Sequence, residues 1–194
     1  MLKRIIATGI TLFCLLGMIG SVTQAQDRPA LRKNSALSGS DRNQRLQRTL
    51  AGAVRHELLT LPYYDVFDWL EAEVGSDGRV VLHGEVVRPT TSDDAEKRVQ
   101  RIEGVSGVVN QIRVLPLSSS DNDLRIALYR AVYDWNSPLF RYAMRAMPPI
   151  HIVVENGRVT LKGAVATELE SQLASNAANR VSGIFEVRNE LRIK

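Results

Sequence analysis

The chain has 194 residues, of which 44% are hydrophobic and 24% are charged, and its formal net charge is +4 at pH 7. The basic residues do not gather into a stripe, so the composition argues against a nucleic-acid-binding protein. The single cysteine, Cys14, lies in the N-terminal apolar run, which excludes a disulfide framework in the rest of the chain.

The N-terminus has the pattern of an export signal. Lys3 and Arg4 precede an apolar run over residues 5–19, and a small-residue site ends at Ala25. The run is shorter than the roughly 20 residues that span a bilayer. We therefore expect a cleavable signal peptide over residues 1–25, a flexible polar leader over 26–40, and no lipid on Cys14, because no lipobox adjoins it.

The rest of the chain contains an internal repeat with a constant offset. Residues 77–86 return as residues 156–165, and the correspondence continues without a gap to the pairs Gly104/Gly183 and Val108/Val187. Such a period is long enough for a small domain with its own core. The copied residues are mainly Gly, Val and Leu, so the repeat preserves a scaffold and predicts no catalytic centre.

In chain order, each copy begins with a helical pattern. In the first copy Ser40 or Asp41 is predicted to cap the start of the helix, and in the second Ser120 or Asp121. The apolar stripe of the second helix is predicted to run on to Trp135. Ser137 and Pro138 then predict a short additional helix that ends near residue 146.

A hairpin, a helix and a last strand are predicted to follow in both copies. Asn156 and Gly157 mark the hairpin turn of the second copy, and the first copy needs a turn one residue longer. Thr167 and Glu170 have capping-box spacing at the start of the next helix. Alternation along the strands makes one sheet face apolar and the other mostly polar, so we expect helices on the apolar face alone.

These elements predict an α+β protein built from two tandem α-β-β-α-β modules. Each module should contain a three-stranded mixed sheet with helices packed on one face, the first over residues 41–117 and the second over 118–194. A unit of roughly 70 residues is near the lower limit for an independent core. We therefore expect the two modules to pack against each other.

The repeated pattern resembles the BON domain. The residues that carry the resemblance are Ile152, Val154, Gly157, Val159, Leu161, Gly163, Val165, Gly183, Val187, Asn189, Leu191 and Ile193, with Gly78, Val80, Leu82, Gly84, Val86, Gly104, Val108, Asn110, Ile112 and Val114 in the first copy. Two such domains behind a signal peptide resemble periplasmic dual-BON proteins of Gram-negative bacteria. That resemblance implies a non-enzymatic role in envelope integrity, osmotic stress and phospholipid attachment.

The candidate binding site lies in the second copy. Residues 118–194 carry 10 basic and 8 acidic side chains, against 10 and 12 in residues 41–117, so the second copy is better suited to an anionic partner. Aromatic rings beside guanidinium groups suit a lipid headgroup layer. The predicted lipid-binding residues are Tyr129, Arg130, Tyr133, Trp135, Arg141, Tyr142 and Arg145.

Two alternatives stay open at this point. The rings could instead fill the seam between helix and sheet, or between the copies, with Trp135 the ring most expected to be buried. The protein could also hold envelope proteins as a chaperone-like factor.

His56, His83 and His151 lack ligand spacing, so no metal or cofactor is predicted. Asn110 and Asn189 are predicted to satisfy backbone groups.

Overall fold

The computed structural model describes residues 39–194. The predicted signal peptide, residues 1–25, lies outside the described residues, as does most of the predicted leader. The first helix, α1 (Gly39–Leu59), contains Asp41 in its first turn.

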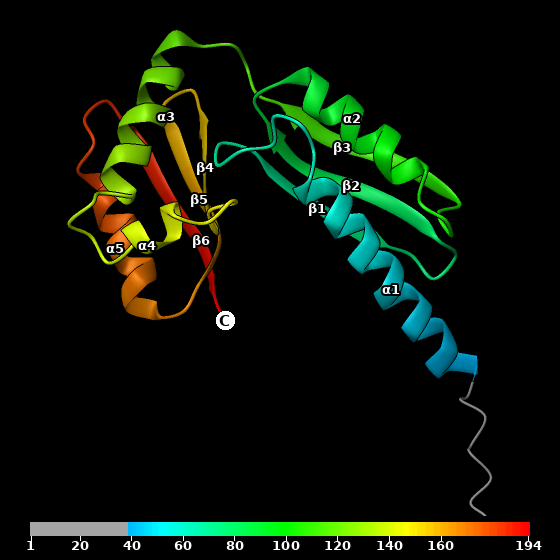
Figure 1. The fold of residues 1–194 in the computed structure, drawn as a ribbon. Helices are drawn as coiled ribbons and strands as arrows, with labels where there is room; N and C mark the ends of the chain where they lie inside the picture. The colour runs from blue at the N-terminus through cyan, green and yellow to red at the C-terminus, as the bar shows by residue number, and fades with distance from the viewer. Residues whose placement is uncertain (1–38) are drawn as a thin grey trace, which may run out of the picture. The chain divides into compact units, whose positions relative to one another are not determined.

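The first module continues from α1 into β1 (Trp69–Val74), β2 (Arg79–Val86), α2 (Pro89–Gln100) and β3 (Gly107–Val114). The second module contains α3 (Ser119–Val132), α4 (Phe140–Ala143), β4 (Ile150–Glu155), β5 (Arg158–Val165), α5 (Glu168–Asn179) and β6 (Glu186–Ile193). Figure 1 shows the same succession of elements in both modules, with α4 as an addition in the second. The predicted α+β fold of two tandem modules is confirmed.

The two sheets have the same topology and the same register. The strand orders are β1-β2-β3 and β4-β5-β6, with an antiparallel hairpin followed by a parallel third strand. Val80 pairs with Val108 in the first sheet, and Val159 pairs with Val187 in the second. The offset seen in the sequence therefore relates equivalent positions in the second and third strands of the two sheets.

Each sheet packs its apolar face against its helices. Val54, Val80, Leu82 and Val99 are fully buried in the first core, and Leu128, Ile152, Leu161 and Ala178 are fully buried in the second. Burying one such aliphatic side chain contributes roughly 1.5–3 kcal/mol. The packing on one face follows directly from the alternation of residues along the strands.

One asparagine ties each third strand to the helix before it. The Asn189 amide donates to the backbone oxygen of Ser171 and to its Oγ at 3.2 and 2.9 Å, and its Oδ1 accepts from Leu191 N–H. Asn110 donates in the same way to Ser92. The predicted structural role of both asparagines is confirmed, and helix contacts add to the backbone contact.

One glycine in each hairpin allows its two strands to approach closely. Gly84 and Gly163 have φ values of +129° and +119°, which L side chains rarely adopt. A Cβ at Gly84 would lie 1.9 Å from Trp69 O, and one at Gly163 would lie 1.9 Å from Pro149 O. Both positions therefore require glycine.

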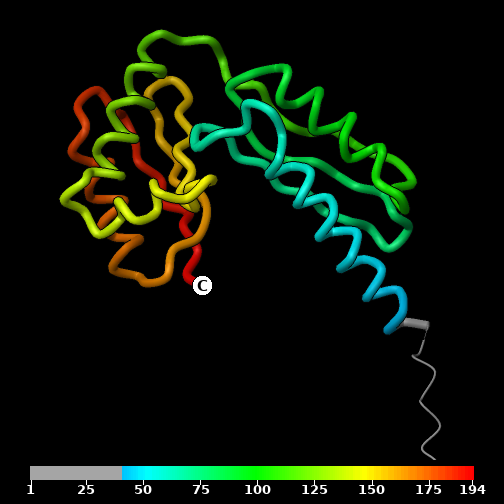
Figure 2. The backbone as a smooth tube through the Cα atoms, in the orientation of Figure 1, coloured from blue at the N-terminus to red at the C-terminus, as the bar shows by residue number. Residues whose placement is uncertain are grey.

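Each module contributes side chains to the hydrophobic core of the other. Val66 and Phe67, which connect α1 to β1, pack in the core of the second module, while Met147 packs against the core of the first. The N–H of Ile152 donates to Val66 O at 2.8 Å, so this connection covers the edge of β4. Figures 1 and 2 show this connection, in cyan, beside the amber β4.

The start of α3 differs in detail from the prediction. Ser118, not Ser120 or Asp121, is the N-cap, and its Oγ accepts from Asp121 N–H at 3.1 Å. The buried Asp121 carboxylate instead accepts from the N–H groups of Asn156 and Gly157 at 2.8 and 2.9 Å. This aspartate therefore holds the hairpin turn, a role that local capping rules do not reveal.

Candidate functional site

Two of the predicted site residues are core residues. Tyr133 and Tyr142 are 4% and 3% exposed. The Tyr133 hydroxyl donates to Ile150 O at 2.6 Å, and the Tyr142 hydroxyl donates to Glu170 Oε2 at 2.8 Å. Burial raises the pKa of Tyr133, since its phenolate would be desolvated. These two buried rings anchor the segment between them to the core of the second module.

Tyr129 is half-buried. Its ring lies 5.1 Å from that of Tyr133 and 6.3 Å from that of Phe67, measured between centroids. Phe67 belongs to the connection that crosses from the first module. The expectation that rings fill the seams of the fold therefore describes Tyr129, Tyr133 and Tyr142.

Trp135 contradicts the alternative in which the rings fill the seams of the fold. That alternative predicts Trp135 to be the most buried ring, yet it is 76% exposed. The reason is that α3 ends at Val132 and the chain leaves helical geometry at Tyr133, with φ −102° and ψ 33°. The helical stripe that would have carried Trp135 inward is interrupted before it reaches this residue.

Three further apolar side chains are exposed on α4, directly after it, and at the start of α5. Phe140 and Met144, four residues apart on and just after α4, are 36% and 75% exposed, and Leu169 in the first turn of α5 is 64% exposed. Side chains at this spacing share one helix face. Sequence reasoning missed Met144 and Leu169 as site residues, because single apolar residues give no signal of exposure.

Glu170 joins α4 to α5. Its carboxylate accepts from Tyr142 Oη, from Ala166 N–H at 2.9 Å and from the Arg141 guanidinium. Burial favours the neutral acid, but the hydrogen bonds from Tyr142 and Ala166 and the charge of Arg141 outweigh it and lower the pKa of Glu170. The predicted capping box with Thr167 is confirmed. This carboxylate therefore fixes α4 against the start of α5.

The predicted arginines are exposed and differ in their partners. Arg141 pairs with Glu170 and lies 5.1 Å from the centre of the Tyr142 ring. Arg145 lies 5.0 Å from the same ring centre, a cation–π geometry. Within residues 39–194, Arg130 and Arg145 form no ion pair. Their charges are available to an anionic partner.

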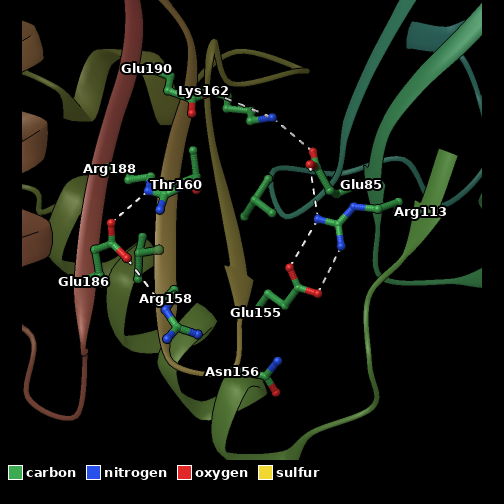
Figure 3. A pocket seen from close by; sticks show the side chains of 12 residues that line it. Glu85, Arg113, Glu155, Asn156, Arg158, Thr160, Lys162, Glu186, Arg188 and Glu190 are labelled. Atoms are coloured by element: carbon green, nitrogen blue, oxygen red, sulfur yellow. Dashed lines mark hydrogen bonds and ion pairs between the residues drawn. The ribbon is translucent and has the colours of Figure 1, made fainter. Parts of the chain in front are cut away.

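A second surface feature is a polar groove of about 210 Å³ that lies over the outer face of the second sheet. Figure 3 shows Glu85 and Arg113 of the first module opposite Glu155 and Lys162 of the second. Arg113 binds Glu155 with both of its terminal nitrogens, at 3.1 and 3.2 Å, and Lys162 lies 3.1 Å from Glu85.

The charges of this groove balance. Its lining contains four basic side chains and four glutamates, and each basic group lies within 4 Å of a glutamate. A groove with paired charges offers no excess charge for an anionic or cationic ligand. It joins the two modules, together with the pair between Glu71 and Arg192 at 2.8 Å.

His151 and Asp68 form a buried polar contact between the two modules. His151 Nδ1 lies 2.6 Å from Asp68 O, and the imidazole stacks on Tyr64 and meets Trp69 edge-on. Burial lowers the pKa of His151 and raises the pKa of Asp68 to about 6. Both side chains serve contacts within the protein.

No helix within residues 39–194 is long and apolar enough to cross a membrane. The same part of the chain contains no group of three or more His, Cys, Asp or Glu side chains arranged to hold a metal ion.

The fold and its surface define an α+β protein of two equivalent modules, of which the second presents exposed rings and arginines. The chain belongs to the BON domain family. The family's sequence model matches it twice, over residues 48–116 and 141–194.

A curated relative is "Outer membrane lipoprotein DolP" of Haemophilus influenzae, which is 28% identical over 114 residues. The match covers 59% of this chain and 58% of that protein, so the chain spans less than two thirds of the relative's length.

Among solved structures, this chain is similar to two of CdsD, described as a structural protein of the type III secretion system of Chlamydia trachomatis. The first is 11% identical with a TM-score of 0.31, and covers 75% of this chain and 92% of that one. The second, its C-terminal domain, is 12% identical with a TM-score of 0.28, and covers 74% and 96%. Such low scores carry no argument about function.

Proposed function

We propose that this protein is a non-enzymatic component of the bacterial envelope that attaches reversibly to anionic phospholipid surfaces through its second module. The observation that carries the proposal is the exposure of Trp135, Phe140 and Met144 in the segment that also presents Arg141 and Arg145. Membership of the BON domain family and similarity to a protein named as an outer membrane lipoprotein support it.

The segment from Tyr133 to Met144 suits this role because its two sides differ. Tyr133 and Tyr142 anchor it in the core, so the exposed rings do not need to be ordered when they meet a membrane. Trp135 and Phe140 would enter the interfacial layer, while Arg145 and Arg130 would contact lipid phosphates. Arg141 can contribute only in part, because Glu170 already binds it.

Attachment of this kind is weak and salt-sensitive. A few rings and arginines lack the permanence of a lipid chain, and salt weakens the attraction of the arginines to phosphate, because charges more than roughly 10 Å apart are largely screened at about 0.1 M salt. We propose a periplasmic location after removal of residues 1–25. Fractionation of cells that express the full chain would test this location and the cleavage.

Vesicle sedimentation tests the function. The exported protein should sediment with vesicles that contain phosphatidylglycerol, and weakly or not at all with phosphatidylcholine vesicles. Trp135→Ala should weaken binding about tenfold, since an interfacial ring is lost. Leu117→Ala is the matched control, because Leu117 is 93% exposed but lies in the linker before α3.

Equal binding of the wild type and Trp135→Ala to anionic vesicles would contradict the proposed surface. Failure of the wild type to bind either vesicle at low salt would contradict the function itself. Suppression of client aggregation without vesicle affinity would instead favour the chaperone-like alternative.

A further inference from the structure

Strand β6 has one hydrogen-bonded neighbour. It pairs with β5, and no strand within residues 39–194 lies on its other side. Lys194 donates its N–H to Val165 O, so even-numbered residues of β6 direct their amides towards β5. The odd-numbered residues therefore direct theirs towards the open edge.

The outward-facing side chains of β6 alternate in sign. Glu186, Arg188, Glu190 and Arg192 occupy successive positions on the face opposite the helices, while Val187 and Leu191 pack inward. An edge strand with charges of one sign resists pairing with another copy of itself. An edge strand with alternating signs does not.

The alternation is self-complementary in the antiparallel direction. If β6 pairs with β6 of a second copy about Asn189, then Arg188 lies opposite Glu190 and Glu186 lies opposite Arg192. Twofold symmetry repeats both pairs, so four cross-strand pairs form and every one joins opposite charges. Directly opposed residues are the pairs that stabilise a sheet.

The neighbouring strand extends this pattern. Glu186 lies 3.6 Å from Arg158 of β5, and Glu190 lies 3.8 Å from Lys162. In the paired arrangement each glutamate would lie between a cation of its own β5 and an arginine of the second copy. Arg188 would gain the most, because its ion pair is with Glu186 of the same strand.

The equivalent strand of the first module lacks this pattern. The outward positions of β3 are Gly107, Val109, Gln111 and Arg113, which offer no opposite-charge pairs in a symmetric arrangement. The charges of β6 are therefore not required by the fold, because β3 has the same fold without them.

Two existing contacts limit the arrangement. Leu191 N–H already donates to Asn189 Oδ1, so the backbone ladder would use the amides of Val187 and Asn189 instead. Arg192 already contacts Glu71 at 2.8 Å, so its pair with Glu186 would be shared. The central pairs between Arg188 and Glu190 are the ones that determine association.

We propose that β6 is a dimerisation edge and that its partner is β6 of a second copy of this chain, in a twofold antiparallel pairing centred on Asn189. The pairing joins two three-stranded sheets into one sheet of six strands and is isologous. It does not depend on the proposed membrane contact, which involves other elements.

A charge-swap experiment tests this directly by sedimentation velocity of the exported protein over a wide range of concentration at low salt. The wild type should show a monomer–dimer equilibrium. Arg188→Glu alone and Glu190→Arg alone should each weaken association about tenfold or more, because each turns two symmetric attractions into repulsions. An equal mixture of the two variants should dimerise again, since every cross-strand pair is then opposite in sign.

Arg48→Glu is the matched control, because it makes the same charge change on an exposed position of α1, and circular dichroism would verify that each variant is folded. The dimer of the wild type and of this control should be alike. A wild type that is monomeric throughout, or a dimer that Arg188→Glu leaves intact, would overturn the proposal. A mixture of folded variants that stays monomeric would also overturn it.

Discussion

The imidazole of His151 lies 2.6 Å from the backbone oxygen of Asp68, a contact between β4 of the second module and the segment that leads into β1 of the first. A carbonyl oxygen only accepts, so Nδ1 carries the proton and donates. The Asp68 carboxylate turns the other way and accepts from Val87 N–H at 2.6 Å. One residue therefore fastens the segment to both modules.

Asp68 gives stability an unusual pH dependence. Its folded pKa of about 6 is above its usual value of 3.8, because burial disfavours the carboxylate. The folded state therefore binds the Asp68 proton more tightly than the unfolded state does. The resulting contribution to the free energy of unfolding is complete below pH 4 and is lost as the pH rises through 6. Asp68→Asn should remove this dependence.

Chemical denaturation of the wild type and Asp68→Asn between pH 4 and 8 measures the effect. The free energy of unfolding of the variant relative to that of the wild type should rise by about 2 kcal/mol from pH 4 to pH 8. The contribution of His151 is common to both proteins and cancels in the comparison. A constant difference across this range would contradict a perturbed Asp68.

Gly163→Ala should destabilise the protein by at least about 3 kcal/mol, or prevent folding. The added Cβ would collide with Pro149 O, and the positive φ would be strained as well. Gly52→Ala is the matched control, because a Cβ there meets nothing within 4 Å in the middle of α1. It should stabilise by about 0.5–1 kcal/mol, and thermal unfolding would measure both.

Trp135 should report membrane contact by fluorescence. In a Trp69→Phe background, its emission should shift to shorter wavelength when anionic vesicles are added, because an exposed indole would enter a less polar layer. Added salt should reverse the shift. An emission maximum that anionic vesicles do not change would show that Trp135 stays in water.

Glu170→Gln should weaken vesicle binding without removing any exposed ring. The amide lacks the charge and the second acceptor oxygen that hold Arg141, whereas Tyr142 Oη and Ala166 N–H share one carboxylate oxygen that the amide oxygen can replace. α4 should then be held less firmly, and Phe140 would need to be ordered on binding. Glu168→Gln in the same helical turn is the control in vesicle sedimentation, and equal loss in both variants would contradict a specific role for Glu170.

Much of the fold could be predicted because its determinants are local. Asn156 and Gly157 specify a hairpin turn, Thr167 and Glu170 specify a helix start, and alternating valines specify the inner face of each sheet. The repeat then allows each prediction made for one copy to be compared with the equivalent residues of the other copy.

The candidate site was less predictable because its determinants are not local. Trp135 continued an apolar stripe, and only the end of α3 at Val132 reverses its burial. Tyr142 is inside because Glu170, far along the chain, receives its hydroxyl. Periodicity places a residue on a helix face, but it does not say where the helix stops or which distant carboxylate completes a contact.

The transfer of Val66 and Phe67 into the second core has a consequence for how the duplication can be dissected. A fragment cut at Ser118 would retain every repeated residue of the second copy and still lack two side chains that fill its interior. Although the two modules are copies of one unit, each needs side chains from the other to complete its core. Neither module is therefore a self-sufficient domain.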